Sequence, residues 1–185
     1  MSGKSQRIMI RNARCVFPKL YTAEEYMGKK NFSIGLLINE DSENLATIEK
    51  AIRAAVEAAY PGDADKMLKR FKKSNQTWPL KELEDGGYSI TPKRKEEQGA
   101  PTVLDQKKHN IPADAGKPYA GCYVNCSIDV FCYTKNGGGV TSYLNGVQFA
   151  KDGEPLGAGA TAASCRDEFD ELEAPEAPQS DDDLM

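Results

Sequence analysis

The stretch YAGCYVNCSIDVFCY, residues 119–133, contains the clearest structural pattern in the chain. Cys, Val and Ile alternate there with aromatic and small polar residues, which predicts a β-strand with two different faces. The segment KNGGG at 135–139 is typical of a turn, and residues 140–149 alternate again. We therefore expect a long β-hairpin whose Cys, Val and Ile face packs into the core.

The other face of this expected hairpin displays aromatic rings. Bases of a single-stranded nucleic acid stack on such rings, at about 1–3 kcal/mol per base. Alternatively, the rings pack beneath a helix or a loop. Asp129 lies in the middle of this face and would repel phosphate unless it accepts a hydrogen bond or points away. The candidate stacking residues are Tyr123, Phe131 and Tyr133, extended by Tyr119 and Tyr143.

Two further strands are expected near the N-terminus. Residues 6–17 alternate and would end at Pro18, and residues 31–39 (NFSIGLLIN) alternate with Phe, Ile and Leu side chains inward. The polar loop expected between these strands carries Tyr21 and Tyr26. We expect these two tyrosines to act as a mobile clamp on a ligand.

Basic residues near these elements could neutralise phosphates. Arg11 and Arg14 are expected on opposite faces of the first strand, so that at most one would contact a ligand. The run PKRKEE would place three cations at a strand end or loop tip, with a nuclear-localisation signal as the alternative. The candidate contacts are Arg11, Arg14, Lys19, Lys29, Lys30, Lys93, Arg94 and Lys95.

Two helices are expected after the second strand. Asp41 or Ser42 can cap a helix with apolar residues at spacings of three and four, and Pro61-Gly62 would stop it. Residues 64–73 predict a shorter basic helix, whose lysines either form a solvated face or contact phosphate.

The middle of the chain, residues 74–117, is rich in Pro, Gly and charge and indicates loops, with short strand candidates at 88–92 and 102–104. Trp78, the single tryptophan, precedes a proline there. This context favours a hydrophobic plug over a stacking site.

Charge is distributed unevenly along the chain. The last nineteen residues, 167–185, carry nine acidic side chains and no Lys or Arg, so a net charge of −4 divides into a body near +5 and a tail of −9. A basic body can follow a polyanion while the tail competes for the same surface or binds a basic partner. The tail composition cannot bury enough apolar surface to fold, so we expect disorder there.

Several classes of protein do not fit the sequence. It has one histidine, His109, and no phosphate-binding or zinc-protease motif, so we expect no catalytic residue, metal or cofactor. No apolar run is long enough to span a membrane, and the start MSGKSQR lacks a secretory segment, which favours the cytoplasm. The five cysteines, Cys15, Cys122, Cys126, Cys132 and Cys165, are an odd number and contain no CxxC pair. Cys122, Cys126 and Cys132 share one face of the expected strand and are expected to be buried and reduced.

Four stretches together resemble a family of phage-encoded single-stranded DNA-binding proteins with an OB-fold, formerly recorded only as a domain of unknown function. They are RNARCVFPKLY, NFSIGLLI, GKPYAGCYVNCSIDVFCY and GVTSYLNGVQFAKDGEPLG, and they cover most of residues 11–157. The resemblance implies a DNA replication or recombination accessory protein that coats exposed strands without catalysis.

The terminal SDDDLM resembles the acidic tips by which single-stranded DNA-binding proteins recruit replication proteins, although it ends in Met where an aromatic residue is usual. The resemblance therefore implies a partner-binding tip. Its residues are Asp181, Asp182, Asp183, Leu184 and Met185.

These observations predict a mainly β protein, an OB-fold-like five-stranded barrel with a helical insertion and a disordered acidic C-terminal tail. We expect the nucleic-acid-binding domain at 1–157, the insertion at about 41–73 and the tail at 158–185. The expected ligand is single-stranded DNA, with duplex DNA, RNA and the oligomeric state left open. The alternatives are a protein-interaction or virion-associated module and a metal-dependent nuclease.

Overall fold

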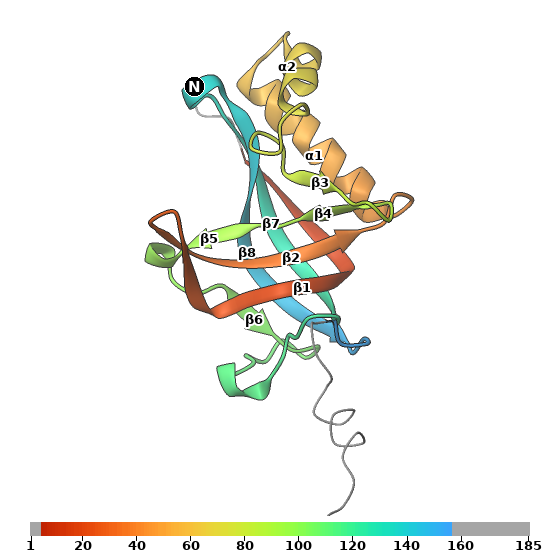
Figure 1. Ribbon diagram of the computed structural model, residues 1–185, viewed down its shortest axis with the longest axis vertical. Coiled ribbons are helices and arrows are strands. Elements are labelled where there is room, and N and C mark those ends of the chain that lie inside the picture. Colours follow the sequence, from red (N-terminus) through yellow and green to blue (C-terminus); the bar gives the residue numbers. More distant parts are fainter. Residues whose placement is uncertain (1–4, 157–185) are drawn as a thin grey trace, which may run out of the picture.

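The computed structural model describes residues 5–156, and five of its strands close into a barrel (Figure 1). Each strand pairs with the next around the ring, and the last pairs with the first. All of these pairs are antiparallel except β5 with β8. The closed ring confirms the expected barrel. In ring order its strands are β1 (Gln6–Tyr26), β7 (Tyr123–Tyr133), β8 (Gly139–Lys151), β5 (Lys93–Lys95) and β2 (Lys29–Ile38).

Two helices, α1 (Glu43–Ala59) and α2 (Ala64–Phe71), follow β2. They lie at the end of the barrel that also carries the turn between β7 and β8, whereas the segment between β6 and β7 lies at the opposite end (Figure 1). The shorter strands are β3 (Leu80–Glu82) and β4 (Tyr88–Ile90), which extend the sheet beside β2, and β6 (Thr102–Leu104), which pairs with β8. Single 3₁₀ turns cover Glu96–Gln98, Ala113–Ala115 and Lys135–Gly137.

The barrel interior is built from the faces that the alternation predicts. On β7 the Cys, Val and Ile residues are buried and the intervening residues are partly exposed. Four of the cysteines are buried free thiols, and burial raises the pKa of Cys126 to about 12 and that of Cys132 to about 11. Cys165 lies outside the described residues. The expected apolar role of the β7 cysteines is therefore confirmed.

The long helix α1 begins and ends as predicted. The Ser42 hydroxyl accepts a hydrogen bond from the Leu45 N–H, which caps the helix, and Tyr60 follows its last residue. Its apolar stripe is buried, and the helix contacts mainly β1 and β7. The helix therefore covers part of the barrel, and α2 extends it with Met67 and Phe71 buried.

The first strand does not end at Pro18, so that prediction is wrong. Strand β1 continues to Tyr26 because its register with β2 shifts between Val16 and Lys19. Phe17 takes a φ of 46° there, and at such a bulge proline loses no ladder hydrogen bond. Tyr21 and Tyr26 are consequently strand residues, not parts of a loop.

The hairpin between β1 and β2 is closed by a two-residue turn, Met27-Gly28. Both residues have positive φ, 50° and 78°, as in the tight turns that fit the twist of paired strands. Tyr26 and Lys29 are therefore paired at the tip of a hairpin. The prediction that Tyr26 lies in a mobile loop is wrong.

The expected faces of Arg11 and Arg14 are also corrected. The register of β1 with β7 shifts between Ile10 and Ala13, and Asn12 has a φ of 50°. This extra residue changes the alternation, so both arginines line one groove next to Tyr123.

Residues 93–95 form a strand of the ring and not a strand end or loop tip. The expected strand at 88–92 is shorter, Tyr88–Ile90, and pairs with β2 and β3 outside the ring. The basic run Lys93–Lys95 bridges β2 and β8.

Candidate nucleic-acid interface

A row of outward residues crosses the barrel. Lys93 of β5 is paired with Ser33 of β2 on one side and with Tyr143 of β8 on the other. Tyr143 is paired with Asp129 of β7, which is paired with Arg7 of β1. Paired residues share a face of a sheet. The row therefore places Lys93, the Tyr143 ring and the Asp129–Arg7 ion pair side by side on the outer surface.

One ring, Tyr143, belongs to this row, and two more, Phe131 and Tyr26, lie beside it. The Phe131 ring centroid is 6.1 Å from that of Tyr143, and the planes are inclined at 46°. The Lys93 Nζ lies 5.8 Å from the centroid of Tyr26, at the hairpin tip. Tyr143 is 38% exposed and Tyr26 is 70% exposed, so both can accept a base. We call Tyr26, Lys93, Phe131 and Tyr143 the aromatic face.

The negative charge of Asp129, which would repel phosphate from the aromatic face, is compensated by Arg7. Arg7 donates through Nε to Asp129 Oδ1 at 2.8 Å and through its Nη2 to Oδ2 at 3.2 Å, and the Asn145 side chain donates to Oδ1 at 3.1 Å. The hydrogen bond from Arg7 holds the pKa of Asp129 below its usual value. Asp129 therefore stays ionised at neutral pH, but its charge is compensated and its oxygens are occupied.

Lysines surround the hairpin next to the aromatic face. Lys29, Lys30 and Lys95 are exposed and line a groove beside Gly28. Glu97 lies 4.0 Å from the Lys95 Nζ, so that cation is partly compensated. Lys29 and Lys30 make no ion pair within the described part of the chain, and a phosphate contact by them remains a prediction.

Arg94 and Arg14, both predicted to contact phosphate, donate hydrogen bonds to backbone carbonyls instead. Arg94 donates to the carbonyls of Gly99 at 2.8 Å, Gln98 at 3.0 Å and Leu144 at 3.4 Å. Arg14 donates to backbone carbonyls of residues 154 and 121 at 2.7 and 3.3 Å. These guanidinium groups already have partners, and Lys19 likewise pairs with Glu24.

Tyr21 and Tyr119 use their hydroxyls to anchor the segment between β6 and β7 and the end of β8. The Tyr21 hydroxyl lies 2.9 Å from the Ile111 carbonyl and 3.0 Å from that of Lys117. The Tyr119 hydroxyl lies 2.8 Å from Asp152 Oδ1, and burial raises the pKa of both tyrosines. Their predicted contact with a ligand remains a prediction, and we leave both out of the aromatic face.

Tyr123 and Tyr133 occupy the two ends of β7. The Lys151 Nζ lies 4.6 Å from the Tyr123 ring centroid, at the groove that contains Arg11 and Arg14. The Tyr133 ring covers Gly139, where a Cβ would come within 3.0 Å of three of its atoms. The five rings of the hairpin therefore do not form one platform. Phe131 and Tyr143 come together, and Tyr123 lies apart.

Sequence reasoning did not single out Arg7, which lies 122 residues from Asp129 in the chain. Only the pairing of β1 with β7 brings the two together, so no local signal could have found it. Trp78, in contrast, is half-buried and packs against the core as the predicted plug.

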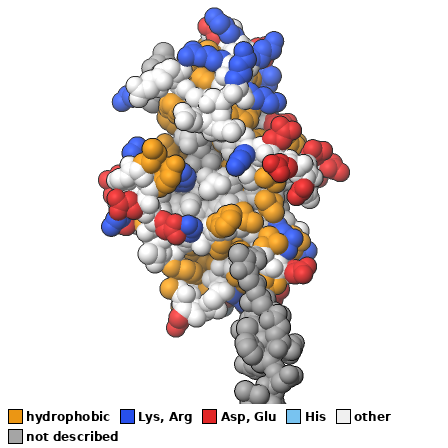
Figure 2. Space-filling view, viewed as in Figure 1, with side chains coloured by type: hydrophobic (Ala, Val, Ile, Leu, Met, Phe, Trp, Pro, Cys, Tyr) orange, Lys and Arg blue, Asp and Glu red, His pale blue; other side chains and the backbone are white. Residues whose placement is uncertain are grey.

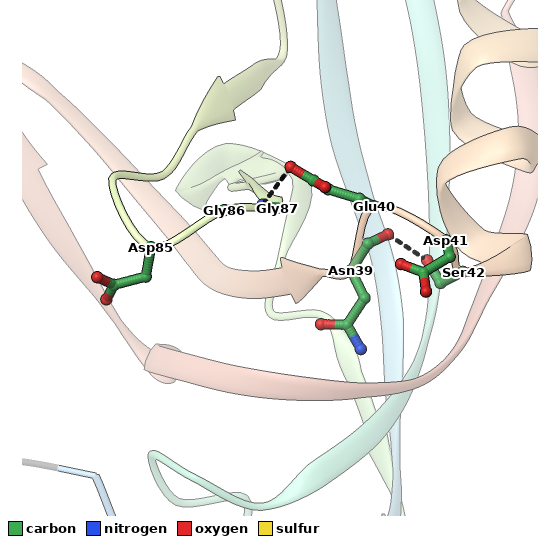
Figure 3. Close-up of a pocket in the computed structure, with 7 residues that line it drawn as sticks. All are labelled: Asn39, Glu40, Asp41, Ser42, Asp85, Gly86 and Gly87. Atoms are coloured by element: carbon green, nitrogen blue, oxygen red, sulfur yellow. Dashed lines mark hydrogen bonds between the residues drawn. The ribbon is translucent and has the colours of Figure 1, made fainter.

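A different hollow, beside the start of α1, is acidic (Figure 3). The Glu40 side chain accepts a hydrogen bond from the Gly87 N–H, and Asp41 and Asp85 also line the hollow. No cluster of three His, Cys, Asp or Glu suited to a metal occurs among residues 5–156. Negative charge here disfavours phosphate.

Within the described part of the chain, no helix combines the length and hydropathy that a transmembrane segment requires.

Comparisons with known proteins agree with this architecture. The solved structure of the single-stranded DNA-binding protein from bacteriophage Enc34 in complex with ssDNA has a TM-score of 0.60 at 23% identity, covering 82% of this chain and 89% of that one. The single-stranded DNA-binding protein gp2.5 encoded by bacteriophage T7 has a TM-score of 0.56 at 15% identity, covering 94% and 100%. Both likenesses show the fold.

Sequence similarity extends over nearly the whole chain. Protein p50 of Acyrthosiphon pisum secondary endosymbiont phage 1 is 26% identical over 174 residues, which are 90% of this chain and 94% of that protein. The profile of the family described as Enterobacter phage Enc34, ssDNA-binding protein, matches residues 6–184. The chain therefore belongs to the family of the phage Enc34 single-stranded DNA-binding protein.

Proposed function

We propose that this protein binds single-stranded DNA along the aromatic face and catalyses no reaction on it. The observation that carries the proposal is the placement of the exposed Tyr143 and Tyr26 rings on either side of Lys93, with Phe131 beside Tyr143. Bases stack on the rings while lysines neutralise phosphates. Membership of the family and the likeness to the Enc34 protein solved in complex with ssDNA support single-stranded DNA as the ligand.

The place of this face on the barrel gives independent support. OB-fold barrels bind oligonucleotides over their second and third strands and the adjoining loops. In the ring here, those strands are β2 and β5, and the adjoining turn is Met27-Gly28. The aromatic face contains Lys93 of β5 and Tyr26 of this hairpin, so it overlaps the surface that the fold class uses.

In the infected cell this activity would serve phage DNA replication, recombination or repair by coating exposed strands in the host cytoplasm. Stacking tolerates any base, so sequence preference should be slight. We propose residues 1–157 as the binding domain, with the helical segment inserted after β2.

Affinity for matched single- and double-stranded oligonucleotides across a salt series tests the proposed function. We expect preference for the single strand and a linear fall of log K with log salt, by roughly 0.7 per neutralised phosphate. Absence of binding would favour a protein-interaction or virion-associated module. Cleavage of a labelled strand with magnesium or manganese would reveal a nuclease.

The acidic tail, 158–185, lies outside the described residues, and its role is part of the proposal. We propose that it competes with DNA for the basic body and recruits replication or recombination proteins through Asp181–Met185 once DNA displaces it. Deleting residues 167–185 should then tighten DNA binding about tenfold at low salt and less at high salt, because salt screens the competition.

A variant of full length with Asn and Gln in place of the nine acidic tail residues is the matched control. It should tighten binding as the deletion does, since the charge is removed while the chain remains. Unchanged or weaker binding after deletion would contradict autoinhibition by the tail.

A further inference from the structure

The outer side of α2 is strongly basic. The helix buries Ala64, Met67 and Phe71 and leaves its cations exposed, and Figure 2 shows Lys and Arg side chains gathered at its end of the molecule. Within the described part of the chain, none of these cations has a carboxylate within 4.0 Å. The exposed cations are Lys66, Lys69 and Arg70 of the helix and Lys72 and Lys73 directly after it.

The acids that could compensate them are engaged elsewhere or few. Asp65 lies 3.0 Å from the Arg53 guanidinium, and Glu57 lies 3.7 Å from the same group. Glu49 lines the groove beside Lys69 and Lys72 and is the one acid among the described residues that line it. The surface therefore keeps a net positive charge that no carboxylate of the described residues compensates.

Trp78 lines two grooves, one that reaches the aromatic face and one beside the basic surface. One groove is lined by Lys93, Thr141, Gln76 and Trp78, so it begins at the aromatic face. The other is lined by Trp78, Leu68, Lys69 and Lys72. The half-buried indole is the wall that the two grooves share.

The helix is held firmly against the barrel, which fixes its cations relative to the grooves. Phe71 is 1% exposed, its ring centroid lies 6.0 Å from that of Tyr60, and its carbonyl accepts a hydrogen bond from the Thr77 hydroxyl at 2.7 Å. The Phe71 ring also packs on Gly138 in the turn between β7 and β8. Both ends of the path are therefore parts of one packed structure.

We propose that Trp78 and α2 form a second segment of the DNA track. A single strand that leaves the aromatic face at Lys93 passes through the groove beside Trp78, and Lys69 and Lys72 neutralise its phosphates. This inference rests on the proposed function and extends it to longer strands. A polyanion fits here because no carboxylate of residues 5–156 pairs with these cations. The acidic hollow near Glu40, which repels a polyanion, lies at the start of α1, whereas α2 follows the other end of that helix (Figure 3).

The test compares oligonucleotides of about 4 and about 16 nucleotides, the range of OB-fold site sizes. The variant Lys69→Ala with Lys72→Ala should bind the long strand about tenfold more weakly at low salt, with a salt slope smaller by roughly 1.4, two phosphates at 0.7 each. It should bind the short strand as the unchanged protein does. Lys107→Ala with Lys108→Ala, which removes the same charge from exposed sites between β6 and β7, is the matched control.

Trp78 supplies a second readout, because it is the single tryptophan in the chain. Its emission should change when the long strand binds and stay unchanged with the short one. Equal loss for both lengths, a loss shared by the control variant, or no Trp78 response to the long strand would overturn the second segment. Failure of the unchanged protein to bind even the long strand would instead overturn the proposed function.

Discussion

Replacing Phe131 and Tyr143 together by alanine is expected to weaken binding of single-stranded DNA by about 2–4 kcal/mol, at least about thirtyfold. Each ring that stacks a base contributes about 1–3 kcal/mol, and each 1.4 kcal/mol is about a factor of ten in affinity. The two rings lie 6.1 Å apart on neighbouring strands, so one strand of DNA can use both. Equilibrium titration with a labelled oligonucleotide measures the loss.

The matched control keeps both rings and exchanges only the hydroxyl, with Phe131→Tyr and Tyr143→Phe. This variant should bind within about threefold of the unchanged protein, because stacking depends on the ring face. The salt slope should be the same in all three proteins, since no cation is removed. A folded alanine variant that binds as tightly as the unchanged protein would show that the bases do not stack on this face.

Alternation along the chain was sufficient to predict the elements that bury one face. Residues 123–133 form the first strand of the expected hairpin because their buried side chains repeat every second residue. Residues 139–151 pair with them across a shift of register after Ser127. The helix after Ser42 was predictable for the same reason, from apolar spacing and a capping residue. These signals are local, and the burial they indicate is confirmed.

The strand that completes the barrel could not be predicted in this way. Lys93–Lys95 has no apolar alternation, and its neighbours β2 and β8 determine its conformation. The prediction that the first strand ends at Pro18 failed because the pairing is irregular at that point. Proline is unfavourable in a regular ladder, but the shift of register after Val16 removes the regular ladder at that point.

The candidate site was predictable in its residue types but not in its membership. The outer face of β7 was recognisable, yet only the pairing of strands shows that Phe131 joins Tyr143 while Tyr123 lies under Lys151. The partners of the tyrosine hydroxyls also lie far away in the sequence. The Ile111 carbonyl, which accepts the hydrogen bond from the Tyr21 hydroxyl, is 90 residues away. Contacts of this kind separate anchoring tyrosines from exposed ones, and no sequence pattern encodes them.

Replacing Phe71 by alanine is expected to lower the free energy of unfolding by about 3–5 kcal/mol, the usual cost of removing a buried aromatic side chain. The ring is nearly inaccessible and packs on Tyr60 and Gly138, so the cavity would open where α2 meets the turn between β7 and β8. Urea unfolding followed by far-ultraviolet circular dichroism should show a lower midpoint with an unchanged slope.

Two further variants locate the effect. Phe71→Leu retains most of the volume and should cost clearly less than alanine, whereas Lys73→Ala, at an exposed position just after α2, should change stability by less than about 0.5 kcal/mol. A loss below about 1 kcal/mol for Phe71→Ala would mean that α2 is not anchored through this ring.

The same variant also tests the second segment of the DNA track. Under conditions where Phe71→Ala remains folded, it should bind short strands as the unchanged protein does and lose the extra affinity that long strands gain. The aromatic face depends on the barrel alone, whereas Lys69 and Lys72 depend on the position of the helix.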